Sequence, residues 1–250
     1  MKNIKLTIEY LGTNYFGWQI LPEKPTIQGE IIKVLEKILQ HPVKLTGASR
    51  TDAGVHAFGQ VANFRTEKEI PLYKLQSALN GLLPPDIKIV SVKEVPLEFD
   101  SRRWAKGKRY RYRIFNRKVP SPFEYKRSWF VPYQLDIPLM KKAKEFLIGT
   151  FDFTSFSKYD RKVDINPIRT VDNIEIVKKE SHIDFIFYGR SFLRHMVRIM
   201  VATLVEVGKG KLRPEDIKEI REKKNRKFAP FLAPPDGLYL EKVYYDNYSY

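Results

Sequence analysis

The sequence predicts an α+β fold made of two halves that share an extended, mainly antiparallel sheet. Segments that alternate polar and apolar residues are interleaved with segments of helical periodicity along the 250 residues. The length suffices for one large domain or two small ones, and no low-complexity linker interrupts it. We therefore expect an N-terminal half at residues 1–100, a C-terminal half at residues 101–250, and a cleft between them.

The first half is predicted to run strand–helix–strand–helix–strand. Side chains alternate between polar and apolar at 5–10, which is typical of a half-buried strand. Ile27, Ile31 and Leu35 then recur at helical spacing, between a capping Thr26 and a terminating Pro42. The other predicted elements are short strands around Leu45 and at 61–64, a helix at 72–82 and a strand at 87–95.

The second half contains the same two kinds of pattern without a repeat of sequence. Its short charged helix starts at Pro214, since proline is tolerated in a first helical turn. The predicted elements are a strand at 109–115, a helix at 139–147, a hairpin of 174–177 and 183–188, a helix at 192–207, the helix at Pro214 and a strand at 238–244.

The composition points to a polyanionic partner. Lys and Arg total 45 against 29 Asp and Glu, a net charge of +16, which favours nucleic acid and leaves acidic membranes as an alternative. Cysteine is absent and the four histidines lack metal-binding spacing, so we expect neither disulfides nor a metal site. The longest apolar run, 196–207, contains Arg198 and Glu206 and is too short to span a bilayer. We expect a soluble cytoplasmic protein without a membrane partner.

The stretch at 47–57 places a single carboxylate, Asp52, in a turn of small residues. Arg50 lies two residues earlier, and residues two apart in extended chain point to the same side. A guanidinium beside a carboxylate favours its charged form, and Gly54 permits a tight turn. The pattern suits a chemically active acid, although a surface turn with an ion pair is the simpler interpretation of an arbitrary R-x-D-x-G.

The stretch at 102–118 combines cations with aromatic residues, as expected where phosphates are neutralised and unpaired bases stack. Alternation puts Tyr110 on one strand face and the arginines on the other. We assign Tyr110 to the substrate pocket and part of the basic face to RNA contact; a solvated strand face is the alternative. The basic face contains Lys108, Arg109, Arg111 and Arg113.

Arg198 lies within an apolar segment, where an unpartnered guanidinium is costly. We expect it to pair with a carboxylate, with Asp52 as the candidate; reaching water or pairing with another acid is the alternative. His56 and His195 are expected to pack or to contact phosphate rather than to catalyse. Leu238 beside Gly237 fits a pocket wall or simple core.

Several ordered motifs together resemble the TruA family of tRNA pseudouridine synthases. They are G-A-S-R-T-D-A-G-V-H-A-F-G-Q-V-A at 47–62, Y-L-G-T-N-Y-F-G-W-Q at 10–19, T-I-Q-G at 26–29, K-R-Y-R-Y at 108–112, D-F-T-S-F at 152–156, F-L-R-H-M-V-R at 192–198 and G-L-Y-L at 237–240. Ser49 stands where the family more often has glycine, and both residues are small.

The resemblance implies two ferredoxin-like (RRM-like) halves and an isomerase that converts uridine to pseudouridine in the tRNA anticodon stem-loop, at positions 38 to 40 in tRNA nomenclature. It implies Asp52 as covalent nucleophile or base at the ribose, Arg198 as its partner, and Tyr110 stacking on uracil and helping to remove the C5 proton. Arg50 would help to extrude the nucleotide, with His56 and Leu238 also at the substrate. No cofactor or metal is implied, and the family suggests a homodimer on tRNA.

Two other classes of function are compatible with parts of the sequence. A non-catalytic RNA-binding protein explains the charge and aromatics, but it does not explain an acid in the 47–57 turn, since a carboxylate repels phosphate. An RNA-directed N-glycosidase or nuclease is the second alternative, although nucleases usually carry clustered carboxylates or paired histidines. Release of tritium from C5-labelled uridine distinguishes the isomerase from both.

Overall fold

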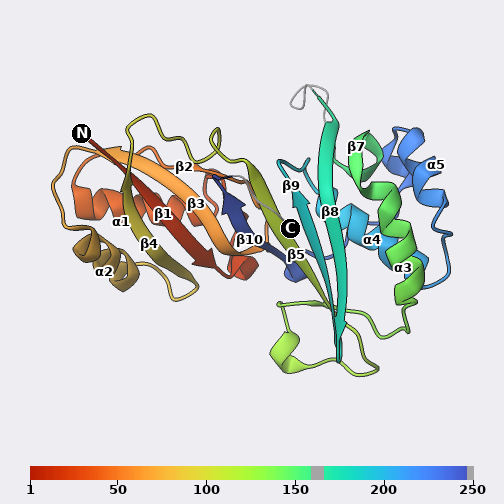
Figure 1. The fold of residues 1–250 in the computed structure, drawn as a ribbon. Coiled ribbons are helices and arrows are strands. Elements are labelled where there is room, and N and C mark those ends of the chain that lie inside the picture. Colours follow the sequence, from red (N-terminus) through yellow and green to blue (C-terminus); the bar gives the residue numbers. More distant parts are fainter. Residues whose placement is uncertain (159–165, 247–250) are drawn as a thin grey trace. The chain divides into compact units, whose positions relative to one another are not determined.

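The computed structural model describes residues 1–158 and 166–246, which divide into two compact units (Figure 1). The first unit contains Met1–Lys106 and residues 239–246, and the second contains the described part of Gly107–Leu238. Each unit combines a largely antiparallel sheet with helices, so the α+β class is confirmed. The ferredoxin-like character of the halves, and a basic cleft between them, stay predictions. No helix of the described residues is long and apolar enough to cross a membrane.

The first unit has the predicted order of strands and helices. In the sheet, β1 lies between β4 and β3 and pairs antiparallel with both, and the short β2 pairs with β3. Helices α1 and α2 pack against each other, and α2 packs against β4. The elements are β1 (Lys2–Tyr10), α1 (Ile27–Leu39), β2 (Thr46–Gly47), β3 (His56–Thr66), α2 (Leu72–Leu82), β4 (Ile87–Val95) and β10 (Leu238–Tyr244).

Local sequence explains these elements. In β1, Ile4, Leu6 and Ile8 are buried while Lys5, Thr7 and Glu9 on the other face are less so, as strand periodicity requires. Thr26 caps α1 by accepting a hydrogen bond at Oγ1 from the Gly29 amide, 3.3 Å away. The apolar stripe of α1 then supplies its buried residues, Ile27, Ile31, Val34, Leu35 and Leu39.

From Tyr239 onward, the last strand, β10, belongs to the first unit, although Gly107–Leu238 of the second unit separates it from Lys106 in the chain. It pairs parallel with β3, with Tyr239 opposite His56 and Leu240 opposite Ala57. A Cβ on Gly59 would lie 2.4 Å from the carbonyl oxygen of Glu241 on β10, so glycine allows the two backbones to approach closely. This pairing fixes β3 immediately after the loop that carries Asp52.

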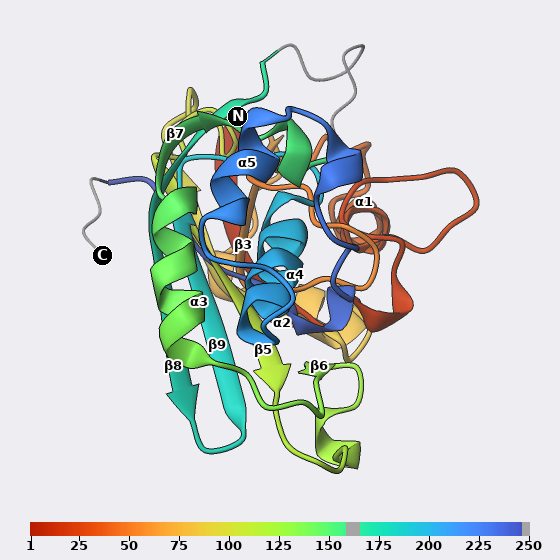
Figure 2. The same cartoon turned by 90° about the vertical axis from the view of Figure 1, so that its right-hand side faces the viewer.

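The second unit has the strand order β5–β9–β8–β7, with each neighbouring pair antiparallel, and β6 pairs parallel with β5. Helices α3 and α4 pack together, α3 against β8 and α4 against β5 (Figure 2). The elements are β5 (Gly107–Phe115), β6 (Trp129–Phe130), α3 (Ile137–Lys144), β7 (Gly149–Asp152), β8 (Ile168–Lys179), β9 (His182–Gly189), α4 (Met196–Gly208) and α5 (Asp216–Glu222).

Three expectations for the second unit were wrong in detail. The short helix predicted to start at Pro214 begins at Asp216. The helix predicted at 192–207 begins only at Met196, because His195 has φ +66°, a left-handed conformation that an α-helix does not accommodate. The Met196 amide instead closes a turn onto the Leu193 carbonyl at 3.1 Å. The helix predicted at 139–147 ends at Lys144 and continues as a 3₁₀ turn over Glu145–Leu147.

Candidate active site

Asp52 lies in the loop that joins β2 to β3 in the first unit. Its side chain is half-buried, and the chain turns directly after it at Ala53 and Gly54. The Val55 amide donates to the Asp52 carbonyl at 3.2 Å, and Gly54 has φ +78°, which glycine adopts without strain. The loop therefore presents one carboxylate from a tight turn, as the sequence predicts.

A second segment, Gly12 to Trp18, fixes the backbone of this loop. The Trp18 amide donates to the Thr51 carbonyl at 3.1 Å, and the Gly54 amide donates to the Tyr15 carbonyl at 3.2 Å. Gly17 has φ +94°, and a Cβ there would lie 2.6 Å from the Thr51 carbonyl oxygen. The two backbones are in contact on both sides of Asp52, which is why this segment contains glycine at close approach.

Buried side chains hold the loop from β1 and β3. The Tyr10 hydroxyl and Thr51 Oγ1 form a hydrogen bond of 2.8 Å. Gln60 is fully buried, donates from Nε2 to the Ser49 carbonyl at 2.7 Å and accepts from the Ser49 amide at 3.2 Å. Periodicity gives Tyr10 and Gln60 no functional role, and their one signal in the sequence is that they lie within the motifs at 10–19 and 47–62.

His56 is fully buried at the start of β3. Its Nδ1 accepts a hydrogen bond from the Gly12 amide at 3.0 Å, and its ring lies 4.8 Å from the ring of Tyr239 on β10. The His56 ring therefore packs within the first unit, whereas its contact with phosphate or substrate stays a prediction.

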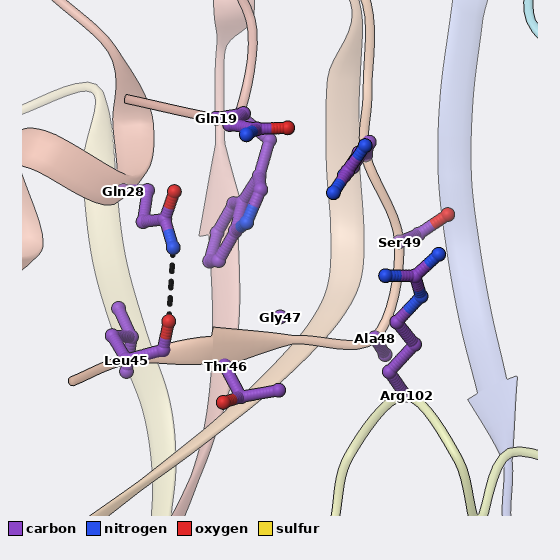
Figure 3. A pocket seen from close by; sticks show the side chains of 10 residues that line it. Gln19, Gln28, Leu45, Thr46, Gly47, Ala48, Ser49 and Arg102 are labelled. Atoms are coloured by element: carbon purple, nitrogen blue, oxygen red, sulfur yellow. Dashed lines mark hydrogen bonds between the residues drawn. The ribbon is translucent and has the colours of Figure 1, made fainter. Parts of the chain in front are cut away.

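Arg50 is exposed and lines a pocket of the first unit, beside the Asp52 loop (Figure 3). In this pocket the Gln28 Nε2 donates to the Leu45 carbonyl at 2.9 Å. The lining residues are Trp18, Gln19, Gln28, Leu45, Thr46, Gly47, Ala48, Ser49, Arg50 and Arg102.

Tyr110 lies on β5 in the second unit, with only 7% of its surface exposed. Its ring meets the ring of Phe192 edge-on at 5.3 Å. The alternation predicted for this strand is confirmed, since Tyr110, Tyr112 and Ile114 are buried while the arginines between them are half-buried.

The arginines of β5 interact with the neighbouring strand β9. Arg113 forms a two-pronged contact with Asp184, Nε to Oδ1 at 3.0 Å and Nη2 to Oδ2 at 3.1 Å, and Arg111 Nη1 lies 3.7 Å from the same carboxylate. The guanidinium of Arg109 lies 5.9 Å from the ring centre of Tyr188. Asp184 therefore offsets part of the charge on this face, and RNA contact by Lys108, Arg109, Arg111 and Arg113 stays a prediction.

Arg198 is buried in the first turn of α4, and its Nε donates to the Ala233 carbonyl at 2.8 Å. The next carbonyl, of Pro234, accepts from the Tyr112 hydroxyl at 2.8 Å. Burial raises the pKa of Tyr112 well above its ordinary value, and the positive charge of Arg198 partly opposes that rise. The loop at Ala233–Pro234 thus positions Arg198, a role that periodicity does not reveal.

The expected partnership of Arg198 with Asp52 joins residues from different units and stays a prediction. Leu238 is buried where β10 begins, beside Gly237, on which a Cβ would lie 2.7 Å from the Tyr112 ring. Its role as a pocket wall likewise stays a prediction.

Comparison with known proteins gives a consistent result. A family model described as tRNA pseudouridine synthase matches residues 6–102 and 143–246. A tRNA pseudouridine synthase A of Thermoanaerobacter sp. (strain X514) is 45% identical over 245 residues, covering 98% of this chain and all of the relative. The Myxococcus xanthus protein of the same name is 42% identical over 246 residues, covering 98% of this chain and 92% of that one.

The chain belongs to the tRNA pseudouridine synthase family. It is therefore an isomerase that converts uridine to pseudouridine, and tRNA is the substrate of its family. In this synthase, Asp52, Arg198 and Leu238 lie inside the stretches matched by the family model, whereas Tyr110 and the arginines of β5 lie between them. The described residues contain no group of three or more His, Cys, Asp or Glu that could hold a metal ion.

Proposed function

We propose that this synthase modifies uridines of the tRNA anticodon stem-loop, at positions 38 to 40 in tRNA nomenclature, with Asp52 as nucleophile. The target nucleotide is extruded from the RNA before reaction, because a base within the stack cannot present its sugar to a side chain. An aspartate suits glycosidic chemistry, since it is anionic at neutral pH and stabilises positive charge at C1′.

The proposed reaction needs no second substrate. The C1′–N1 bond breaks as the Asp52 carboxylate bonds to C1′, and the freed uracil turns so that C5 faces the sugar. A C1′–C5 bond then forms and releases the carboxylate. The C5 proton is removed and N1 gains a proton, so that product and substrate are isomers.

The other proposed roles follow from the chemistry of each residue. Tyr110 stacks on the uracil and assists removal of the C5 proton. Arg198 orients the Asp52 carboxylate, Arg50 assists extrusion, and Leu238 and His56 lie at the substrate. The RNA backbone is contacted by the basic face of β5, which consists of Lys108, Arg109, Arg111 and Arg113. Asp184 forms ion pairs with Arg111 and Arg113 and so reduces the positive charge that this face offers to phosphates.

The observation that carries the proposal is the way the Asp52 loop is held. An acid on an ordinary surface turn needs no frame, whereas hydrogen bonds fix this loop at Ser49, Thr51 and Gly54. A catalytic group gains from such pre-organisation, because small misplacement of a reacting atom costs large factors in rate.

Replacing Asp52 with alanine tests the nucleophile. We expect Asp52→Ala to abolish tritium release from C5-labelled uridine in a tRNA transcript while tRNA binding stays within about twofold. Glu69→Ala, an exposed acid of the same unit, serves as control and should turn over normally. Retained release by Asp52→Ala would reject the assignment.

Replacing Tyr110 with phenylalanine tests the proton transfer. We expect Tyr110→Phe to keep the ring packing against Phe192 but to lower turnover by about 100-fold, the scale of a lost general acid–base group. Single-turnover tritium release measures this directly. A native rate in the variant would show that the phenol is not needed.

We further propose that the enzyme works in the cytoplasm as a homodimer that holds one tRNA across both subunits. Sedimentation of the protein alone and with one equivalent of tRNA tests this. A monomer at micromolar concentration in both samples contradicts it.

A further inference from the structure

The pocket beside the Asp52 loop has no assigned occupant. It is built entirely from the first unit, and two of its lining residues, Ser49 and Arg50, lead directly into Thr51 and Asp52. Figure 3 shows Arg102 extending from its own loop toward Ser49, with Gln19 and Gln28 on the far side of Gly47. Two segments far apart in sequence therefore contribute an arginine each.

The chemistry of the pocket favours an anion. Arg50 and Arg102 are both exposed, and among the described residues none of the ten that line the pocket is acidic. Two guanidinium groups, each a planar fork of N–H donors, match the oxygens of a phosphate. Gln19 adds an exposed amide at the same site.

Hydrogen bonds of Asp100 and Ser101 hold the loop that carries Arg102. Asp100 Oδ1 accepts from the backbone amides of Arg102 at 2.9 Å and Arg103 at 2.8 Å. The buried Ser101 donates from Oγ to the Thr46 carbonyl at 2.6 Å and from its amide to Asn63 Oδ1 at 2.9 Å. Arg102 is thereby anchored to the strand that forms the pocket floor.

The opposite wall is equally well determined. The indole of Trp18 is buried against Gly47, on which a Cβ would lie 2.5 Å from the ring. Gln28 uses both ends of its amide within the protein, donating to Leu45 and accepting from the Ile20 amide at 3.1 Å. The exposed groups of Arg50, Arg102 and Gln19 thus stand on a rigid base.

We propose that this pocket binds one backbone phosphate of the tRNA strand that carries the target uridine, held between Arg50 and Arg102. The inference rests on the proposed function and adds a binding residue, Arg102, to it. Two residues of extended chain span about 7 Å, so a phosphate at Arg50 lies within one or two nucleotides of a uridine at Asp52. Binding there fixes the strand on one side of the extruded nucleotide.

A matched pair of arginines tests the proposal. Arg102 and Arg103 are adjacent, exposed and anchored through the same Asp100 oxygen, but only Arg102 lines the pocket. Binding is measured over a range of salt concentrations to a tRNA transcript with cytidine at the target positions, which binds without reacting. Arg102→Gln should weaken binding about 3- to 10-fold and reduce the salt slope by about 1.

The Arg103→Gln control distinguishes a specific phosphate site from general electrostatic attraction. Arg103→Gln should leave the slope nearly unchanged, and Arg102→Lys should restore part of the affinity, which a folding defect would not. Equal effects of Arg102→Gln and Arg103→Gln would overturn the proposal, because they would indicate diffuse attraction rather than one site.

Single neutral linkages identify the ligand. A methylphosphonate placed at each linkage within two nucleotides of the target should weaken binding at one position for the native protein and cause no further loss for Arg102→Gln. If no methylphosphonate shows this coupling with Arg102→Gln, the pocket does not bind a phosphate. The same conclusion holds if the effect of Arg102→Gln is coupled instead to removal of a base from the RNA. If the coupling is found but the wild-type protein releases no tritium from its substrate, the proposed chemistry is rejected and the phosphate site is still supported.

Discussion

The two units position their proposed catalytic residues by different means. In the first unit, Asp52 lies in a loop whose backbone is clamped by another loop, with glycines where the two approach. In the second unit, Tyr110 and Arg198 project from a strand and a helix, and burial among neighbours sets their orientation. An acid on irregular backbone needs a dedicated frame, whereas residues on regular elements inherit theirs from the fold.

The two units should therefore respond differently to substitution. The frame around Asp52 depends on space for backbone, which a single methyl group removes. The arrangement around Arg198 depends on individual side-chain bonds, such as that from Nε to Ala233, and removal of one leaves the helix in place. Single substitutions around Asp52 should therefore cause large losses of turnover and stability, whereas those around Arg198 should cause smaller losses.

Adding a methyl group at Gly12 should break the frame and give the largest effect. A Cβ at this position would overlap the Val55 carbonyl, which belongs to the Asp52 loop. We expect Gly12→Ala to lower turnover by about 100-fold or more and the free energy of unfolding by about 2–4 kcal/mol. Tritium release and urea denaturation measure the two quantities.

The control for that substitution is Gly81→Ala, near the end of α2. A Cβ there would meet no atom within 4 Å. Because alanine favours helix over glycine, this variant should gain about 0.5–1 kcal/mol of stability with native turnover. A Gly12→Ala protein as active as Gly81→Ala would show that the clamp is not required.

Arg198→Lys should give an intermediate effect. The variant keeps the positive charge but loses the fixed Nε donation to Ala233, so we expect about a tenfold drop in turnover and about 1 kcal/mol less stability. Arg221→Lys is the matched control, since Arg221 donates from Nη1 to the Phe146 carbonyl within the same unit. The control should lose similar stability without loss of turnover; a similar loss of turnover in both would assign Arg198 a purely structural role.

Alkaline pH should give the smallest effect, with stability nearly unchanged around neutrality and lowered only above about pH 10. Burial raises the pKa of Tyr112, and burial together with the hydrogen bond to Asp86 raises that of Tyr15. The folded state favours the neutral phenol, so its stabilisation is complete below the unfolded pKa of about 10 and is lost as pH rises through the folded value.

The test compares Tyr112→Phe with the native chain between pH 9 and 11.5. The native protein should lose up to about 1.4 kcal/mol per pH unit above 10 through Tyr112, and Tyr112→Phe should show a shallower slope. Tyr15→Phe should change the slope in the same direction. Identical slopes in all three proteins would mean that these phenols ionise as easily when folded as when unfolded.

Periodic segments made much of the fold predictable. The bounds of α2, β4 and β10 agree with those expected from alternation and helical spacing, because each pattern ends at a proline or a change of period. The observed start of α4 differs from the expected one, because the apolar run begins at Phe192 and Leu193 whereas His195 takes a left-handed conformation before the helix. Apolar content alone does not distinguish helix from the turn before it.

The site was predictable to the extent that it lies in local motifs. Asp52, its glycines and the buried face of β5 follow from sequence. The pairing of Arg113 with Asp184, 71 residues away, and the carbonyl partner of Arg198 do not, since long-range contacts leave no spacing to read. The role of Gln60 could not be predicted either, because its side chain bonds the backbone of Ser49 and such a contact leaves no residue pattern in the sequence.

The parallel pairing of β10 with β3 has a consequence for synthesis of the protein. Residues 239–246 leave the ribosome after Met1–Lys106 and after Gly107–Leu238 of the second unit. Until they arrive, β3 lacks Tyr239 against His56, and the sheet edge next to the Asp52 loop is uncovered. The nascent first unit is thus kept unfinished during translation, and the closing of its sheet coincides with the arrival of the late strand, a non-local step of the kind that slows folding.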